Sequence, residues 1–178
     1  MSETDGNESA VLAALDALGI EYERIEIDPA FGDTADFCRE YGYPVPECGN
    51  TILIASRIEP RQFAACVVRA DTRLDVNRRV RKLMGVRKAS FASAEDTVAH
   101  TGMAIGGVTA FALPEGLPIY VDAAVFDLDR VILGSGVRRS KIAVAPGAGR
   151  PAPPGGGFKK EPAPRADKNR EEGGVGWI

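Results

Sequence analysis

The residues of this sequence whose types and positions suit chemistry are an amide, a pair of glycines and a carboxylate. Asn50 stands at the start of the apolar run NTILIAS, where an amide can donate hydrogen bonds to a ligand. Gly106 and Gly107 free the backbone of the segment AIGGVTAFALPEG, so that their N–H groups can hold an oxyanion or a carbonyl, although a plain turn is the alternative. Asp122 interrupts the apolar run LPIYVDAAV, either as a cap at the end of a strand or as a residue that faces a pocket.

Neither a protein nucleophile nor a metal centre is indicated by the sequence. His100 is the only histidine, and its place at the end of a predicted helix favours a structural role, so a zinc hydrolase is nearly excluded. Ser135 in GSG lacks the strand–turn–helix context of a nucleophile elbow. Cys38, Cys48 and Cys66 are odd in number and show no CxxC spacing, which favours reduced thiols. No histidine or paired cysteine near Cys48 in the sequence activates it, so we expect no metal and no cofactor.

Positive charge is concentrated in two segments of a chain whose formal net charge is −3. Such a chain does not attract polyanions through its overall field, so contact with nucleic acid requires a local basic patch. The two segments are NRRVRKLMGVRK and VRRSK, and a solvated helix face is the alternative for the first. Their basic residues are Arg78, Arg79, Arg81, Lys82, Arg87, Lys88, Arg138, Arg139 and Lys141.

Helices and strands are interspersed without a regular βαβ rhythm, which predicts an α+β fold with a mixed sheet. Helical spacing of apolar residues predicts helices that end near Gly19, Tyr41, Gly85 and Gly102. The predicted N-caps are Asp33 or Thr34, Asp75 and Ser93. Strands are predicted at 20–27, 50–56, 63–70, 88–92, 117–126, 130–136 and 140–145, with the second and third paired antiparallel.

The composition predicts one domain with a terminal extension. Residues 10–145 are long enough to close a hydrophobic core, and residues 1–9 are polar and predicted to be frayed. Residues 146–178 are rich in proline, glycine and charge, and we predict a disordered tail there. Because the sequence shows no signal peptide and no apolar run of membrane-spanning length, we expect a cytoplasmic protein without a membrane contact.

The order of four segments resembles that of the YbaK-type aminoacyl-tRNA deacylases, which include the editing domain inserted in bacterial prolyl-tRNA synthetases. The resemblance covers roughly residues 20–144, and its most specific parts are the TG-x3-GG loop, the strand LPIYVD and the closing GSG and RRSK. It implies a mixed β-sheet, partly closed like a barrel and packed by helices. It also implies hydrolysis of the ester between a mischarged amino acid and tRNA, with the carbonyl held by backbone donors and no covalent intermediate.

The resemblance also implies roles for individual residues. Asn50, Gly106, Gly107 and Asp122 form the catalytic set. The substrate-binding residues are Tyr22, Phe31, Ile52, Thr109 and Gly136, of which the bulky ones limit the pocket to a small amino acid. The tRNA-binding residues are Arg73, Arg138, Arg139 and Lys141.

Two positions depart from the family pattern. Asn50 stands where the family usually has a lysine in KTL, which binds near the terminal adenosine phosphate, so a charge is missing there. Arg73, Arg138 or Arg139 is a possible source of that charge. Ala110 stands where the loop motif usually has proline, which loosens a loop that must be preorganised.

Three functions follow as hypotheses. The first is a trans-acting deacylase that hydrolyses tRNA mischarged with a small amino acid. The second is a module of the same fold that binds aminoacyl-tRNA with little turnover, for which Asn50 and Ala110 speak. The third is a regulatory protein without a tRNA function.

Overall fold

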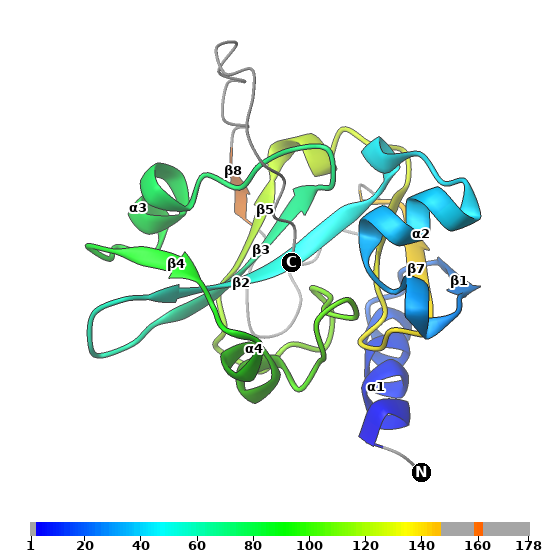
Figure 1. Cartoon of the computed structure of the whole chain (residues 1–178), viewed down its shortest axis with the longest axis horizontal. Coiled ribbons are helices and arrows are strands. Elements are labelled where there is room, and N and C mark those ends of the chain that lie inside the picture. The colour runs from blue at the N-terminus through cyan, green and yellow to red at the C-terminus, as the bar shows by residue number, and fades with distance from the viewer. Residues whose placement is uncertain (1–2, 147–158, 162–178) are drawn as a thin grey trace.

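The computed structural model of this chain describes residues 3–146 and 159–161, and its strands form two sheets (Figure 1). One sheet has the order β1-β7-β6 and the other the order β4-β2-β3-β5-β8. The strands are β1 (Tyr22–Glu26), β2 (Gly49–Ser56), β3 (Phe63–Arg69), β4 (Ala89–Phe91), β5 (Ile119–Asp122), β6 (Val131–Gly134), β7 (Ser140–Val144) and β8 (Lys159–Glu161). The helices are α1 (Glu3–Ala17), α2 (Thr34–Tyr41), α3 (Arg81–Leu83) and α4 (Ala94–Thr101). Shorter helical turns are η1 (Pro29–Phe31), η2 (Val45–Glu47), η3 (Val76–Val80) and η4 (Ala123–Val125).

The predicted α+β class is confirmed, and the larger sheet is mixed. Strand β2 pairs antiparallel with β3 and β4, whereas β5 runs parallel to β3. The two sheets do not close into one barrel. In the described part of the chain they are joined by a parallel bridge between Cys48 and Ile132.

Local signals in the sequence set most of the element boundaries. Helix α2 ends at Gly42, whose φ of 72° lies in the left-handed region that glycine adopts without strain. Ser93 caps α4 by accepting a hydrogen bond from the backbone N–H of Asp96, as predicted. Asp75 caps η3 in the same way through the N–H of Arg78. The fifth predicted strand is shorter than expected, because the chain turns into η4 directly after Asp122.

The two faces of the larger sheet pack against different partners. One face packs against the smaller sheet and α1 in the main core, which contains Val11, Leu15, Ala65, Val67, Val108, Ala110, Ile119, Val121, Val131, Leu133, Ile142 and Val144. The other face is covered at one end by α2, which packs near Cys48 and Ala70. At the other end it is covered by η3 and by Met84 and Val86 after α3, which pack with Ile54 and Cys66.

The N-terminal helix begins earlier than the sequence suggested. Residues 1–9 were predicted to be frayed, but α1 starts at Glu3. The reason is Glu8, a buried carboxylate that accepts hydrogen bonds from Arg24 at 2.7 Å, Arg139 at 2.9 Å and Ser140 at 2.5 Å. Burial alone raises the pKa of Glu8, but these hydrogen bonds outweigh it and lower the pKa to about 2. This network ties α1 to both β1 and β7.

The predicted disordered tail lies largely outside the described residues. Within it, the structure describes β8, which pairs parallel with β5 and places Glu161 opposite Asp122. In the described ranges 3–146 and 159–161, no helix is both long and apolar enough to cross a membrane.

We predict that Glu8→Gln lowers the free energy of unfolding by about 2–3 kcal/mol at pH 7, because it removes the charge that pairs with two arginines. The folded-state pKa of Glu8 is about 2 and its ordinary value is 4.5, so its contribution is present above pH 4.5 and is lost as the pH falls toward 2. Denaturant unfolding between pH 7 and pH 2 measures both effects. The matched control is Glu26→Gln, an exposed carboxylate on β1 that lies 3.8 Å from Arg24, one of the partners of Glu8. Parallel acid profiles for wild type and Glu8→Gln contradict this assignment.

Candidate active site

Residues 28–34 lie between two parts of the candidate site. They contact Asn50 on one side and the cations Arg138 and Lys141, which bind the loop around Gly106, on the other. Asp28 caps η1 by accepting a hydrogen bond from the N–H of Ala30 at 2.8 Å, and Pro29 begins that turn. Asp33 is the N-cap residue of α2, yet its side chain makes no cap hydrogen bond. The carboxylate of Asp33 instead pairs with Arg138, at 3.1 Å between Nη1 and Oδ1.

Lys141 joins this segment to residues 104–116, which we call the glycine loop. Its side chain comes from β7 and is 4% exposed. Its Nζ donates hydrogen bonds to the carbonyl of Gly32 at 2.6 Å and to the carbonyl of Gly106 at 3.1 Å. The ring of Phe37 lies 5.8 Å from Nζ on another side. Burial lowers the pKa of the Lys141 amine to about 8, because the charged form is poorly solvated there.

Arg138 makes a second connection between the same two segments. Its Nε donates to the carbonyl of Pro29 at 3.1 Å, and its Nη1 donates to the carbonyl of Ile105 at 2.9 Å. The guanidinium also pairs with both oxygens of Asp33. Lys141 and Arg138 together therefore fix the glycine loop against the start of α2, and we call this pair the cationic clasp.

The glycine loop is held closely against the hairpin between β6 and β7. A Cβ on Gly107 would meet backbone atoms of Val137 at 2.7 Å, so only glycine fits there. The N–H of Gly107 donates to the carbonyl of Ala104 at 2.9 Å, and its carbonyl accepts from the N–H of Gly136 at 2.8 Å. Gly107 and Gly136 therefore support the loop. The N–H of Gly107 was predicted to bind the substrate, but it is already taken by the carbonyl of Ala104.

Among the described residues the loop leaves backbone donors unused at Gly106, as predicted for that residue, and also just beyond Gly107. Within the described residues, no acceptor is seen for the backbone N–H groups of Val108, Thr109 and Ala110. The Oγ1 of Thr109, a fully buried residue, also has no partner there. Buried donors without partners are costly, so they mark a place for a carbonyl or an oxyanion. Ala110 contributes to it directly, because proline at this position has no N–H.

Asn50 and Asp122 lie in one row across three strands. Asn50 pairs with Val68 on β3, and the parallel register of Val67 with Val121 brings Asp122 to the other side of Val68. Two strand spacings separate Asn50 from Asp122, about 10 Å between their Cα atoms. This row lies between the part of the face covered by α2 and the part covered by η3 and α3.

The hydrogen bonds of this row leave polar groups for a ligand. The Oδ1 of Asn50 accepts from the hydroxyl of Thr34 at 2.6 Å, so the Asn50 amide is oriented by the segment that the cationic clasp holds. Its Nδ2 has no acceptor in the part of the chain that the structure describes. One oxygen of Asp122 accepts from the N–H of Ala124 at 2.9 Å, which confirms the strand-end cap.

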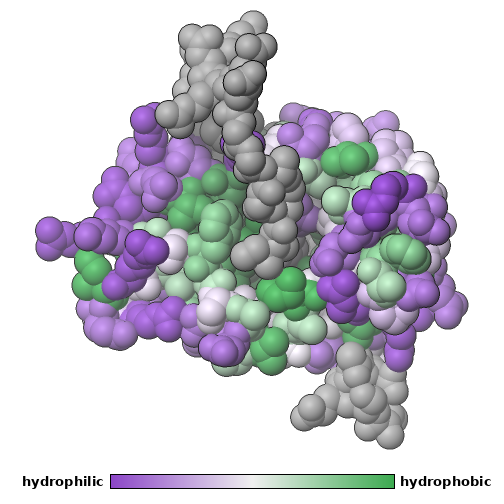
Figure 2. Space-filling model, viewed as in Figure 1, coloured by the Kyte–Doolittle hydropathy of each residue, from purple (hydrophilic) through white to green (hydrophobic). Residues whose placement is uncertain are grey.

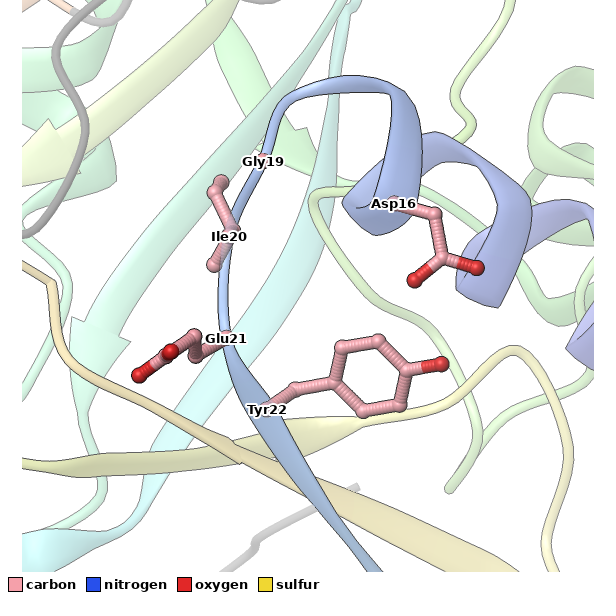
Figure 3. A pocket seen from close by; sticks show the side chains of 5 residues that line it. All are labelled: Asp16, Gly19, Ile20, Glu21 and Tyr22. Carbon is pink, nitrogen blue, oxygen red and sulfur yellow. The ribbon is translucent and has the colours of Figure 1, made fainter.

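The predicted wall residues are not brought together. Tyr22 lines a pocket at the turn between α1 and β1 with Asp16, Gly19, Ile20 and Glu21 (Figure 3). That pocket contains neither Asn50 nor a residue of the glycine loop. Phe31 packs edge-on against Tyr41, with ring centroids 6.3 Å apart. Ile52 packs against the cluster that contains Val76 and Val80 of η3. Their side chains therefore do not form one common wall around the row and the loop.

The residues predicted to bind tRNA also separate into groups. Arg73 is exposed. Arg139 pairs with Glu8 at 2.9 Å, and Arg138 belongs to the cationic clasp. The Lys141 amine is too deeply buried to reach the phosphates of an RNA at the surface, so its position does not suit the predicted contact.

Sequence reasoning missed a cysteine pair and the roles of two loop residues. The sulfur atoms of Cys38 and Cys48 lie 3.4 Å apart, although ten positions separate them in the chain. Burial raises the pKa of the Cys48 thiol well above its ordinary range, so this thiol stays protonated. Asp33 and Thr34 were considered only as helix caps, and nothing in their local sequence indicated Arg138 or Asn50 as partners.

No group of three histidine, cysteine or acidic side chains in the described part of the chain is arranged to hold a metal ion. The site instead consists of backbone donors, an amide, a carboxylate and two internal cations. This set can bind a carbonyl and a ribose or phosphate, and it carries no activated nucleophile of its own.

Comparison with known proteins gives the family. The profile of the aminoacyl-tRNA editing domain matches residues 28–150, more than half of the sequence, and the chain belongs to this family. Among solved structures, the hypothetical protein APE2540 is similar with a TM-score of 0.69 and 23% identity, over 77% of this chain and 89% of that chain. A candidate trans-editing enzyme for prolyl tRNA synthetase is similar with a TM-score of 0.67 and 21% identity, over 79% of this chain and 87% of that chain. At these identities the two structures show a shared fold.

We predict that Lys141→Met makes the stability of the protein less dependent on pH above 8. The amine has a pKa of about 8 in the folded protein and 10.5 ordinarily, so the unfolded chain binds more protons between these values. The wild type should therefore gain about 3 kcal/mol relative to the variant as the pH rises from 8 to 10.5.

Denaturant unfolding at pH 7, 8, 9 and 10 measures this difference, with the exposed Lys82→Met as the matched control. If the gap between wild type and Lys141→Met stays constant over this range, the amine is not buried in the way described.

Proposed function

We propose that this protein is a trans-acting aminoacyl-tRNA deacylase that hydrolyses the ester of a mischarged tRNA. The observation that carries the proposal is the row of unpartnered N–H groups at Val108, Thr109 and Ala110, next to a loop clasped by two cations. Membership of the aminoacyl-tRNA editing domain family supports the same reaction. The similar structure of a candidate trans-editing enzyme for prolyl tRNA synthetase agrees with an activity in trans.

In the proposed reaction, water is the nucleophile. Its oxygen adds to the ester carbonyl carbon, and the carbonyl oxygen becomes an oxyanion that the N–H groups of residues 108–110 stabilise. The bond to the ribose oxygen then breaks, and that oxygen takes up the proton that the water loses. The oxygen of Asp122 that does not cap η4 orients the water, and Nδ2 of Asn50 donates to the terminal ribose or its phosphate.

We propose that the amino acid removed from the tRNA is small. Val108, Ala110 and Phe111 are buried in the main core, so an amino-acid side chain directed to that side of the loop finds little space. Tyr22, Phe31 and Ile52 do not together limit the size of the amino-acid side chain. We attribute this limit to the close packing of the loop.

The test is single-turnover deacylation by purified protein of a panel of tRNAs charged with alanine, serine, cysteine, proline, leucine and phenylalanine. Rapid hydrolysis of a small aminoacyl group with slow hydrolysis of leucyl and phenylalanyl esters is expected. Binding of the charged tRNAs without hydrolysis above the spontaneous rate would instead identify a module without turnover. The absence of both binding and hydrolysis would indicate that the protein has no tRNA function.

We predict that Asn50→Ala lowers the deacylation rate about tenfold, because one hydrogen bond to the terminal nucleotide is lost. Asn50→Lys should preserve or raise the rate, since a lysine amine adds charge at the same position. Asn50→Ala also removes the acceptor of the Thr34 hydroxyl, at a cost of about 1 kcal/mol in unfolding free energy.

Rates and unfolding curves are measured on the same two variants. If both variants lose stability but keep the wild-type rate per folded molecule, Asn50 only supports the turn between η2 and β2.

A further inference from the structure

The segment formed by η3 and α3 has one apolar side and one basic side. Val76 and Val80 are buried on its apolar side, where they pack with Ile54 and Cys66 of the larger sheet. The hydroxyl of Tyr120 on β5 donates to the carbonyl of Leu83 and anchors the segment. Most of the basic residues that follow Asp75 in the sequence are exposed. Figure 2 shows hydrophilic surface where Figure 1 places α3.

Five cations in this segment or next to it in the sequence are exposed and, within the described residues, unpaired. We call them the η3–α3 basic surface, and they are Arg73, Arg78, Lys82, Arg87 and Lys88. Within the described residues, none of them forms an ion pair or donates a side-chain hydrogen bond. Arg81 is the structural member of the segment, because its guanidinium donates to the carbonyls of Asn77 and Arg87 and fixes the turn at Gly85.

Outside this surface most arginines of the described chain have carboxylate partners, whereas the exposed Arg57 has none there, and its backbone N–H donates to the carbonyl of Lys88. Carboxylates pair with the arginines at 24, 39, 61, 69, 130, 138 and 139. The chain has 25 acidic residues and 22 basic ones, so acidic side chains are not scarce. The nearby carboxylate of Asp75 accepts from the N–H of Arg78 and, in the described part of the chain, forms no ion pair with the five cations. Cations without carboxylate partners repel one another, and a polyanion relieves that repulsion.

The η3–α3 basic surface is continuous with the candidate site. The N–H of Ala70, at the end of β3, donates to the carbonyl of Cys48, two positions before Asn50. Residues 71–75 lead from this strand end to η3, and Arg73 lies among them. The apolar side of η3 covers the same sheet face as the row of Asn50 and Asp122, starting two residues further along β2 at Ile52.

We propose that the η3–α3 basic surface binds the phosphate backbone of the tRNA acceptor stem and directs its 3′ end toward Asn50. This proposal rests on the proposed function. It assigns the RNA contact to Arg73, Arg78, Lys82, Arg87 and Lys88, and it leaves Arg138 and Lys141 with their internal contacts. The contacts are to phosphates, so they carry no sequence preference.

The experiment compares two double variants in the full chain. Arg78→Gln with Lys82→Gln removes two charges from the η3–α3 basic surface. Arg39→Gln with Arg130→Gln removes two exposed charges that have carboxylate partners elsewhere. Binding of uncharged tRNA is measured between 50 and 300 mM salt, and hydrolysis is measured with a charged tRNA and with the aminoacyl ester of adenosine, which has no stem.

The expected result for the first variant is a loss of about 10- to 100-fold in tRNA affinity at 0.1 M salt. The slope of log affinity against log salt should fall by about 1.4–1.8, and hydrolysis of the adenosine ester should be unchanged. The second variant should behave as wild type. Equal tRNA affinities and salt slopes for all three proteins would overturn the proposal.

The outcomes separate this proposal from the proposed function. If wild type hydrolyses neither substrate, the deacylase assignment fails, while the tRNA affinities still decide the role of the basic surface. If wild type hydrolyses both substrates and the first variant binds tRNA normally, the deacylase assignment stands and the basic surface is wrong. Selective loss of binding to phosphatidylserine vesicles, with tRNA binding intact, would also overturn the proposal and would indicate a membrane partner.

Discussion

One buried amine determines the geometry of the candidate site. Lys141 has two carbonyl partners that belong to different segments of the chain, Gly32 before α2 and Gly106 in the glycine loop. A buried amine that loses its acceptors is strongly disfavoured, so the distance between these segments is fixed as long as the amine stays in place. The orientation of Asn50 depends on the same contact, because Thr34 follows Gly32 by two residues and binds the Asn50 amide.

The elements could be read from the sequence where short-range rules decide, and the site could not be read where contacts are distant. Gly42, Asp75 and Ser93 mark helix ends because their effect depends on neighbouring backbone groups, and they were identified correctly. Lys141 finds its partners 109 and 35 positions away, so no local pattern distinguishes it from a surface lysine. Glu8 was assigned to a frayed segment for the same reason, since its partner Arg139 lies 131 positions away.

The two departures from the family pattern have a physical account in this fold. Position 50 lacks a positive charge, but two cations from β7 and the turn before it bind the residue 28–33 segment that leads to the Thr34 partner of Asn50. Position 110 lacks a proline, but Ala110 adds its own N–H to those of Val108 and Thr109, which we propose as donors to the oxyanion. Under the proposed function, preorganisation comes from the cationic clasp and from close packing, in place of a rigid ring and a charged side chain.

The close approach of Gly134 to the glycine loop has a consequence for how the protein opens. A Cβ at Gly134 would lie 2.4 Å from the carbonyl oxygen of Val108, so the β6–β7 hairpin and the loop touch through their backbones. Backbone contacts of this kind leave no room for sliding, so the loop and hairpin move as one body and the loop does not serve as a lid. Any movement that admits the proposed substrate must then belong to elements other than this loop and hairpin.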